Sequence, residues 1–457
     1  MADVAGLLSE IVGDRNVETG SAIADDYAHD EALTATAQLP AYLARPRSTD
    51  EVAAIVTLAG EHGLPVTARG SGTGLCGGAV PAADAILISF ERMNRIVEID
   101  LENHMAVIEP GVTLQELDEA LLPLGLVYPV FPGEYSASLG GNVATNAGGM
   151  RAVKYGVTRS QVLALVAVLG TGEVIRTGGK FMKATSGYDL TQLIIGSEGT
   201  LAIVTEATVR LYPRPEHVAT VLAPYRSLKA ITDAIPAIVW SGVGPVILEY
   251  IDFLSMGGIL SSAGLELGVP NAVKETALAY LVVVLEEQSE SRLEENLAKL
   301  AELLGAFNAL DVYVLPAQAG AQLIEARERA FFVAKAAGAD DIIDMVMPRN
   351  QMTTYLETVG DLARASGSFV TGCGHAGDGN VHISVFQSDP ATRHAFIHDV
   401  FVAGMALGGA ISGEHGIGTE KRSYFLEFED PAKLALMRRI KSAFDPAGIL
   451  NPGKLLD

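Results

Sequence analysis

The alternation of apolar and polar positions predicts a first region that mixes helices and strands. Residues 48–62 carry apolar side chains at helical spacing, and Ser48 with Glu51 forms the pattern of a capping box at the start of that helix. A further helix is predicted at 113–125 on the same grounds, with Gly125 as its stop. Apolar runs without helical spacing predict strands at 65–69, 85–90, 95–100, 105–111, 162–170, 173–178 and 199–215.

From about residue 218 the rhythm changes to strands that alternate with longer helices, predicted at 291–305 and 321–338. Pro213 and Pro215 mark the boundary before this change. The predicted strands are 219–225, 245–252, 278–286, 311–316, 341–348, 368–375 and 380–386. We therefore expect an α+β protein with an N-terminal helical segment at 1–36, a first domain at 37–213 and a second domain at 218–457.

The composition indicates a globular enzyme and excludes several classes of function. The chain has 457 residues, of which 49% are hydrophobic and 19% charged, and its net charge is -23. So acidic a chain lacks the cationic side chains that supply most of the affinity for nucleic acid. No apolar run approaches the ~20 residues of a membrane-spanning helix, and the acidic start lacks a secretory signal. We expect a cytoplasmic protein, with peripheral attachment to the inner face of the membrane as an alternative.

Cys76 and Cys373 are the only cysteines. Two cysteines are too few for a four-thiolate iron–sulfur cluster or a cysteine-based zinc site. Electrons taken up by this chain must therefore leave to an external acceptor, such as a quinone, a cytochrome or an iron–sulfur subunit. The oligomeric state is left open, with a homodimer as one alternative.

Residues 69–80 read RGSGTGLCGGAV, in which Gly72, Gly74 and Gly77 have the G-x-G-x-x-G spacing of a dinucleotide fingerprint. In a nicotinamide site a helix begins at these glycines and directs its N-terminus at the pyrophosphate. Here a loop and then strands follow, so the condition for that interpretation is not met. A second glycine-rich run lies at 131–149. Two such loops predict a long anionic ligand, such as a diphosphate dinucleotide, held by backbone N–H groups.

Together with GSEGTLAIVTEATVRLYP at 196–213, these loops resemble the FAD domain of the vanillyl-alcohol oxidase and para-cresol methylhydroxylase (PCMH) type over essentially all of 37–213. The resemblance implies a PCMH-type domain of two α+β subdomains, then an FAD-linked oxidase C-terminal domain with a large, mainly antiparallel sheet flanked by helices. Some relatives attach FAD to a histidine in the first loop; residues 71–73 contain none, which implies non-covalent FAD. The positions that match the family's FAD-binding residues are Arg69, Gly70, Ser71, Gly72, Thr73, Gly74, Leu75, Gly78, Pro132, Gly133, Ser138, Leu139, Gly140, Gly141, Asn142, Thr145, Asn146, Gly148, Gly149, Glu198, Gly199, Ile203, Val204 and Asn451.

The second domain contains a constellation typical of a divalent metal site. GCGHAGDGNVHISVF holds His375 and His382, and ISGEHGIGTEKR holds Glu414 and His415. On one straight strand the two histidines of the first motif would face opposite sides, since side chains alternate. Turn-forming residues at 377–380 predict a reversal that brings the two imidazoles together.

These motifs resemble those of the FAD-linked 2-hydroxy acid dehydrogenases: D-lactate dehydrogenases, the flavin subunit of glycolate oxidase and D-2-hydroxyglutarate dehydrogenase. The resemblance implies that His375, His382 and Glu414 hold a divalent metal, zinc or manganese, and that His415 lies over the substrate. Such a metal would lower the pKa of a chelated hydroxyl, so that His415 could accept its proton while the Cα hydride passes to the flavin.

Arg327 is the candidate for the substrate carboxylate, because a guanidinium binds carboxylates in bidentate fashion. The alternative from the sequence is a solvated residue in a run of Arg and Glu on a helix. Asn380 is expected either to touch the substrate or to orient a ligand. Ile342 takes the place where the D-2-hydroxyglutarate enzymes carry a lysine, which weakens the case for a dicarboxylate.

We therefore expect an FAD-dependent dehydrogenase that oxidises a small 2-hydroxy acid, D-lactate or glycolate, to the 2-oxo acid. One alternative keeps the fold but changes the substrate to D-2-hydroxyglutarate, a sugar acid or an alditol. Another is a non-catalytic flavin-binding subunit of an oxidase complex.

Overall fold

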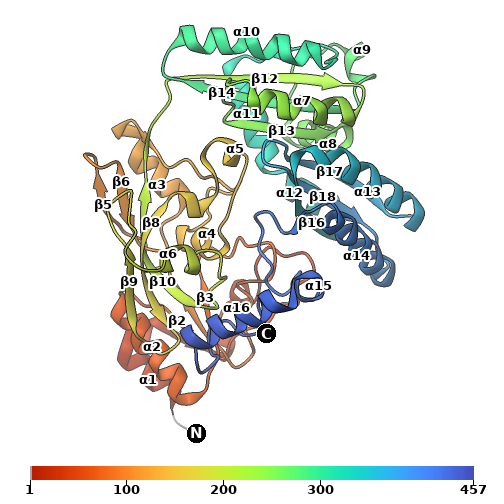
Figure 1. Cartoon of the computed structure of the whole chain (residues 1–457). Helices are drawn as coiled ribbons and strands as arrows, with labels where there is room; N and C mark the ends of the chain where they lie inside the picture. The colour runs from red at the N-terminus through yellow and green to blue at the C-terminus, as the bar shows by residue number, and fades with distance from the viewer. Residues whose placement is uncertain (1–2, 457) are drawn as a thin grey trace.

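The first region is built from two separate sheets (Figure 1). The computed structural model describes residues 3–456. A four-stranded sheet in the order β1-β2-β4-β3 is followed along the chain by a five-stranded antiparallel sheet in the order β5-β6-β10-β8-β9. Their strands are β1 (Val17–Thr19), β2 (Tyr42–Ala44), β3 (Val66–Arg69), β4 (Ile86–Ser89), β5 (Ile96–Asp100), β6 (Met105–Ile108), β8 (Val162–Leu169), β9 (Val174–Gly178) and β10 (Ala202–Arg210).

Each of these sheets has its own apolar core and helices. The first core joins α1 and α2 to the four-stranded sheet, and the second joins α3 and α4 to the five-stranded sheet. The helices are α1 (Val4–Val12), α2 (Thr49–His62), α3 (Leu114–Leu121), α4 (Leu139–Thr145), α5 (Ala152–Tyr155) and α6 (Leu190–Ile194), and a small ladder pairs β7 (Leu126–Val127) with β11 (Tyr212–Pro213). The expectation of two α+β subdomains is confirmed.

The second region is one eight-stranded sheet in the order β15-β12-β14-β13-β17-β18-β16-β19, antiparallel throughout. This confirms the predicted antiparallel sheet. Its strands are β12 (His217–Tyr225), β13 (Ile247–Asp252), β14 (Ala279–Glu287), β15 (Tyr313–Val314), β16 (Asp341–Val346), β17 (Phe369–His375), β18 (Asn380–Phe386) and β19 (Ala410–Ile411). Its helices are α7 (Leu228–Trp240), α8 (Phe253–Ala263), α9 (Asn271–Lys274), α10 (Glu290–Ala306), α11 (Ala317–Glu328), α12 (Ala330–Ala336), α13 (Met352–Ser366) and α14 (Pro390–Ala406).

The two faces of the large sheet have different coverings. Helices α7, α10, α13 and α14 share one core with residues such as Val381, Ile383 and Val385 of β18. Helices α8 and α11 share a smaller core on the opposite face, with Ile251 and Cys373. Because side chains alternate along a strand, His382, Ser384 and Phe386 of β18 all face this second side, where the functional residues lie.

The chain end returns to the first region. Helix α15 (Arg422–Phe428) packs on the core that α14 shares with the large sheet, and α16 (Pro431–Phe444) then runs back to the first region (Figure 1), where Phe444 packs on the core of the five-stranded sheet. Leu450 then forms a parallel bridge with Val66 next to β3, and Asn451 N donates to Val66 O at 2.7 Å. Residues 444–451 therefore pack on the first region although they follow the second in sequence.

Three local features differ from the sequence-based expectations. The segment before residue 37, expected to be helical, also supplies β1. The helix predicted at 321–338 is divided at Arg329 into α11 and α12. The second glycine-rich run is not all loop, because α4 begins after Ser138.

Candidate functional site

A hairpin brings the first two histidines together. Strand β17 ends at His375, the turn 376–379 follows, and β18 begins at Asn380. The register pairs Cys373 with His382, so the two histidines are diagonal neighbours on one face of the sheet. Their Nε2 atoms lie 3.2 Å apart. The predicted reversal is confirmed.

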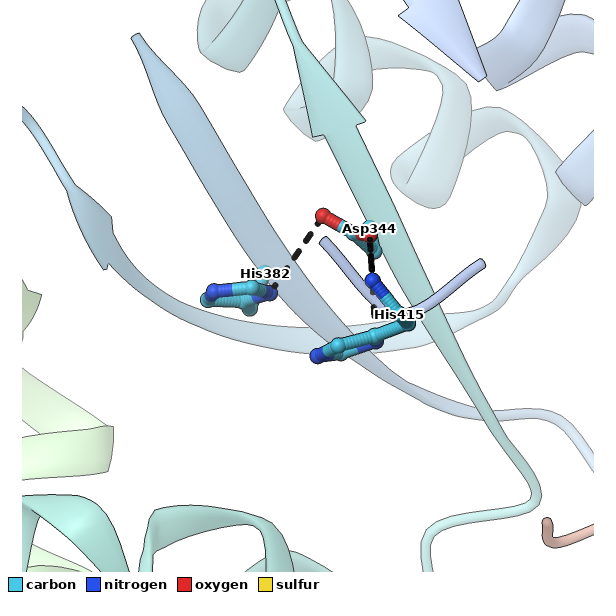
Figure 2. Close-up of side chains that lie close together, drawn as sticks. All are labelled: Asp344, His382 and His415. Carbon is cyan, nitrogen blue, oxygen red and sulfur yellow. Dashed lines mark hydrogen bonds and ion pairs between the residues drawn. The ribbon is translucent and has the colours of Figure 1, made fainter. Parts of the chain in front are cut away.

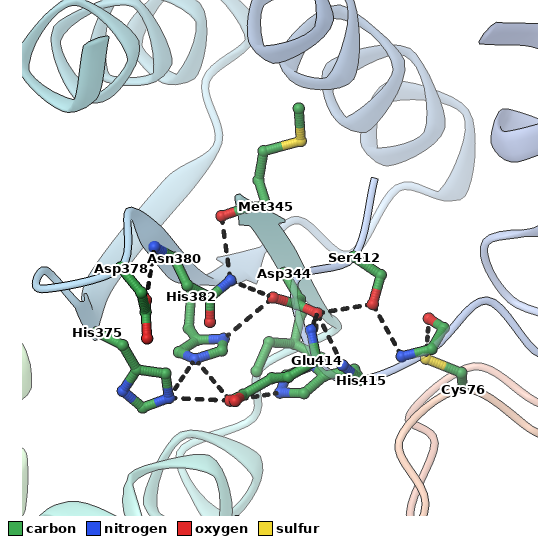
Figure 3. A network of polar contacts seen from close by, with 12 residues as sticks. Cys76, Asp344, Met345, His375, Asp378, Asn380, His382, Ser412, Glu414 and His415 are labelled. Atoms are coloured by element: carbon green, nitrogen blue, oxygen red, sulfur yellow. Dashed lines mark hydrogen bonds and ion pairs between the residues drawn. The ribbon is translucent and has the colours of Figure 1, made fainter. Parts of the chain in front are cut away.

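Glu414 completes a cluster of three potential metal ligands (Figure 3). Its Oε1 lies 2.9 Å from His375 Nε2 and 3.2 Å from His382 Nε2. Atoms bound at about 2.0–2.2 Å to one ion are separated by about 3–3.5 Å, so these three positions suit a single divalent ion. Imidazole nitrogens and a carboxylate are ligands of zinc and manganese.

Glu249, a buried residue of β13, fixes the orientation of His375. Its Oε1 lies 2.6 Å from His375 Nδ1, and because a carboxylate only accepts, Nδ1 carries a hydrogen, so Nε2 is the ring nitrogen left to bind a metal at the cluster. Burial by itself lowers the pKa of His375, but Glu249 and Glu414 outweigh it and raise that pKa well above its ordinary value. The surroundings therefore favour a positive charge at this point, which a metal ion would also supply.

Asp344 of β16 holds the turn that carries Glu414 and His415, and its side chain lies beside the imidazoles of His382 and His415 (Figure 2). Its Oδ2 accepts from the backbone N–H of Glu414 at 2.9 Å and of His415 at 2.8 Å, and from Ser412 Oγ at 2.8 Å. Its Oδ1 lies 3.7 Å from His382 Nδ1. Burial raises the pKa of Asp344, but the two nearby imidazoles and these donors outweigh it, so the pKa is lowered and the group is ionised.

His415 stacks on His382, with ring centroids 4.9 Å apart and planes 13° from parallel. It lines both a cavity of about 460 Å³ against the large sheet and a cavity of about 190 Å³ in the first region. Burial lowers the pKa of His415 to about 4. At neutral pH the imidazole is therefore uncharged and able to accept a proton.

Arg327, at the end of α11, lines the larger cavity together with the metal-type cluster. Its Nη2 contacts Glu249 Oε2 at 2.7 Å, but the contact is not aligned as a hydrogen bond. Its Nε and Nη2 are buried and have no hydrogen-bond acceptor among the described residues. The structure thus places Arg327 at the cavity, as one of the two sequence alternatives expected, in an ion pair with Glu249.

Asn380 does not lie at the cavity, unlike Arg327 and His415, the other two predicted substrate contacts. Its Nδ2 donates to Asp344 Oδ1 at 2.6 Å and to Met345 O at 3.2 Å, and the residue does not line the cavity. Of the two roles considered for Asn380, this position suits orientation of a neighbouring carboxylate.

The two glycine-rich runs face each other across a cleft in the first region. Ser71 N donates to Ser138 Oγ at 3.3 Å, and a Cβ on Gly70 would collide with that same hydroxyl. A Cβ on Gly148 would collide with Glu414, so the second run also approaches the metal-type cluster. Asn451 Nδ2 links two segments that line the cleft, because it donates to both Gly78 O and Glu198 O.

Most of the residues predicted to bind the cofactor line this cleft or the cavities that adjoin it. Leu139 and Asn146 do not: the Leu139 side chain lies in the apolar core, and Asn146 Oδ1 accepts from Arg159 N. The Arg69 guanidinium lies beneath the first loop, where Nη1 donates to His29 O.

A family model described as FAD linked oxidases, C-terminal domain, matches residues 214–455. The chain belongs to this family. A second model, described as FAD binding domain, matches residues 40–178. The first match covers the second region and the returning chain end, and the second covers most of the first region.

Relatives of this FAD-linked oxidase extend over nearly its whole length. An uncharacterized FAD-linked oxidoreductase of Mycobacterium tuberculosis is 55% identical over 453 residues, 99% of each chain. A D-lactate dehydrogenase of Anaerostipes hadrus is 37% identical over 455 residues, 97% of this chain and 95% of the relative. The structure of p-cresol methylhydroxylase with substrate bound matches with a TM-score of 0.84 at 18% identity, covering 99% of this chain and 96% of the other, and shows the shared PCMH-type fold.

The cleft of this FAD-linked oxidase fits the flavin that its family implies. It is lined by residues of both glycine-rich runs, and it adjoins the larger cavity at Leu75, Pro132 and His415, which border both spaces. In the described part of the chain, no helix combines the length and apolarity needed to cross a membrane.

Sequence reasoning missed Glu249 and Asp344. Each is an acidic residue with apolar neighbours near the middle of a strand, in the stretches VILEYID and DIIDMVM, and each is buried in the structure. A buried carboxylate requires a hydrogen-bond or charged partner. An acidic residue between apolar residues of a predicted strand was therefore a signal of a polar site.

Proposed function

We propose that this protein is an FAD-dependent dehydrogenase that oxidises a small 2-hydroxy acid, such as D-lactate or glycolate, to the 2-oxo acid. The observation that carries the proposal is the position of His415. It stands between the cleft suited to FAD and the cavity that holds the metal-type cluster and Arg327.

Each part of a 2-hydroxy acid has a counterpart in the cavity. The guanidinium of Arg327, which lines the cavity, can bind the carboxylate. His375, His382 and Glu414 would hold the metal, zinc or manganese, which when bound lowers the pKa of the substrate hydroxyl. The neutral imidazole of His415 then accepts the hydroxyl proton. FAD, when bound without a covalent link, supplies the acceptor for the hydride from Cα.

Two further features support the assignment. D-lactate dehydrogenase and a glycolate oxidase subunit are the names of relatives at 37% and 36% identity. Ile342 lines the cavity, so the position compared with a lysine in the D-2-hydroxyglutarate enzymes offers no cation to a second carboxylate. Reoxidation requires an external acceptor, a quinone, a cytochrome or an iron–sulfur subunit.

The test is anaerobic reduction of the FAD-loaded protein by a panel of acids, followed as bleaching of the flavin absorbance. D-lactate or glycolate should bleach the flavin, and L-lactate and D-2-hydroxyglutarate should do so more slowly. If no 2-hydroxy acid bleaches it, the protein is not a dehydrogenase of this class, and a non-catalytic flavin-binding subunit becomes the better account.

A further inference from the structure

The cavity extends well beyond the residues that would bind the head group of a 2-hydroxy acid. The strand register arranges its floor in three rows. The first row holds Cys373 and His382, with Asp344 beside them. The second row is Thr371, Ser384 and Ile342, and the third is Phe369 and Phe386.

These rows form a channel that leads away from the metal-type cluster. His382 and Phe386 are four residues apart on β18, a distance of roughly 13 Å along an extended strand. All five side chains of the second and third rows line the cavity. The two phenylalanine rings at the far end lie 5.4 Å apart.

The roof of this channel is apolar and comes from two helices. Leu254 and Ile259 of α8 and Phe331 and Val333 of α12 line the same cavity. A Cβ on Gly258 would lie 3.4 Å from Val333 Cγ1, so the two helices are in close contact.

The charged groups of the cavity gather at its other end. Arg327, Glu414 and the histidines belong to the cluster region, and Glu328 lies against Gly133 of the second glycine-rich run. Among the described residues that line the channel beyond His382, none carries a charge. The channel mouth is apolar as well, since Phe369 and Leu254 are each 51% exposed.

The Cα substituent of D-lactate is a methyl group and that of glycolate is a hydrogen, and either would leave the channel unfilled. The end of the cavity beside Pro132 and Gly149 is the one bordered by predicted flavin-binding residues, so FAD does not account for the rows on β16, β17 and β18. Burial of apolar surface in such a pocket contributes to binding in proportion to the area removed from water.

We propose that this channel binds an extended apolar side chain of the substrate, so that the preferred 2-hydroxy acids carry an alkyl tail of several carbons. The inference rests on the proposed function, because the head group and the reaction are unchanged. D-lactate and glycolate carry the head group alone.

The experiment compares D-2-hydroxyoctanoate with D-lactate as reductants of the FAD-loaded full-length protein under anaerobic conditions. We expect the apparent second-order rate constant of flavin reduction to be at least about tenfold higher for 2-hydroxyoctanoate, since single methylenes in apolar pockets discriminate by about that factor. Ser384→Phe fills the middle row and should lower the octanoate-to-lactate ratio by at least about tenfold. Ala334→Phe in α12 obstructs the same channel from the roof and should act in the same direction.

Ser442→Phe, on the exposed surface of α16, is the matched control and should leave the ratio unchanged. An equal or better rate with D-lactate, or a ratio unaffected in folded, FAD-loaded Ser384→Phe and Ala334→Phe, would overturn the inference and leave the proposed function intact. A variant that slows reoxidation by a quinone but not reduction would assign the channel to the acceptor instead. If neither acid reduces the flavin, the proposed function fails, and the inference fails with it.

Discussion

The flavin cleft and the metal-type cluster are built in opposite ways. The cleft is lined largely by residues of two glycine-rich runs, which contact each other at Gly70 and Ser138. The cluster is made of side chains, and its members come from strands and turns far apart in the chain. The two meet at His415.

The difference separates cofactor binding from chemistry. A change in the cleft away from Gly148 should weaken FAD binding and leave the metal site complete, whereas a change in the cluster should stop the reaction and leave FAD bound. Each of the following variants tests one side of that separation.

The largest effect in the cluster is expected from His382→Ala. The substitution removes one of three candidate metal ligands, the one that lies beside both His375 and Glu414. It should reduce the metal content and slow flavin reduction about a thousandfold, because a bound metal contributes several kcal/mol to such reactions. Metal analysis and flavin reduction measure the two effects. His398→Ala, at a surface pair with Glu427, is the control; unchanged metal content in His382→Ala would remove the residue from the ligand set.

Asp344→Asn should have an intermediate effect. The carboxylate holds the backbone of Glu414 and His415, and loss of such supporting contacts at metal sites costs about tenfold to a hundredfold. Flavin reduction by D-lactate should slow by that factor, with FAD content unchanged. Asp361→Asn on the exposed surface of α13 is the control, and a rate equal to the wild type would show that Asp344 does not position the turn.

On the other side of the comparison, Gly70→Val should weaken FAD binding. The added side chain collides with Ser138, and overpacking of this kind costs about 1–3 kcal/mol, which would be about fivefold to 150-fold in affinity. Titration of the flavin-free protein with FAD measures the change. Gly305→Val on α10, where a Cβ meets nothing within 4 Å, should bind FAD normally. Loss of the metal in Gly70→Val, with FAD affinity retained, would contradict the separation.

The smallest effect concerns pH. Burial lowers the pKa of His415 to about 4. The imidazole therefore stays neutral at pH values well below the ordinary pKa of histidine, and it becomes protonated only as the pH falls through about 4. The rate constant of flavin reduction should therefore change little between about pH 5 and 7. A fall centred near pH 6.5 would show that His415 titrates as an exposed histidine.

The cleft could be predicted from the sequence more fully than the cluster, because its residues are close together in the chain. The glycine-rich runs are local in sequence, so the cleft could be predicted from them, although the short helix at 139–145 within the second run could not be separated from its loop. In the cluster, the turn residues beside His375 and His382 predicted the hairpin. Glu249 and Asp344 could not be placed without the strand register that sets them opposite those histidines, and the return of Leu450 to β3 is a long-range contact with no local signal.

The most direct test of the account is anaerobic flavin reduction by D-lactate in FAD-loaded His415→Asn, beside the wild type and His398→Asn. The account predicts that all three proteins bind FAD equally and that His415→Asn alone is reduced about 10²–10⁴-fold more slowly, the usual contribution of a positioned base. Reduction of His415→Asn at the wild-type rate would contradict it.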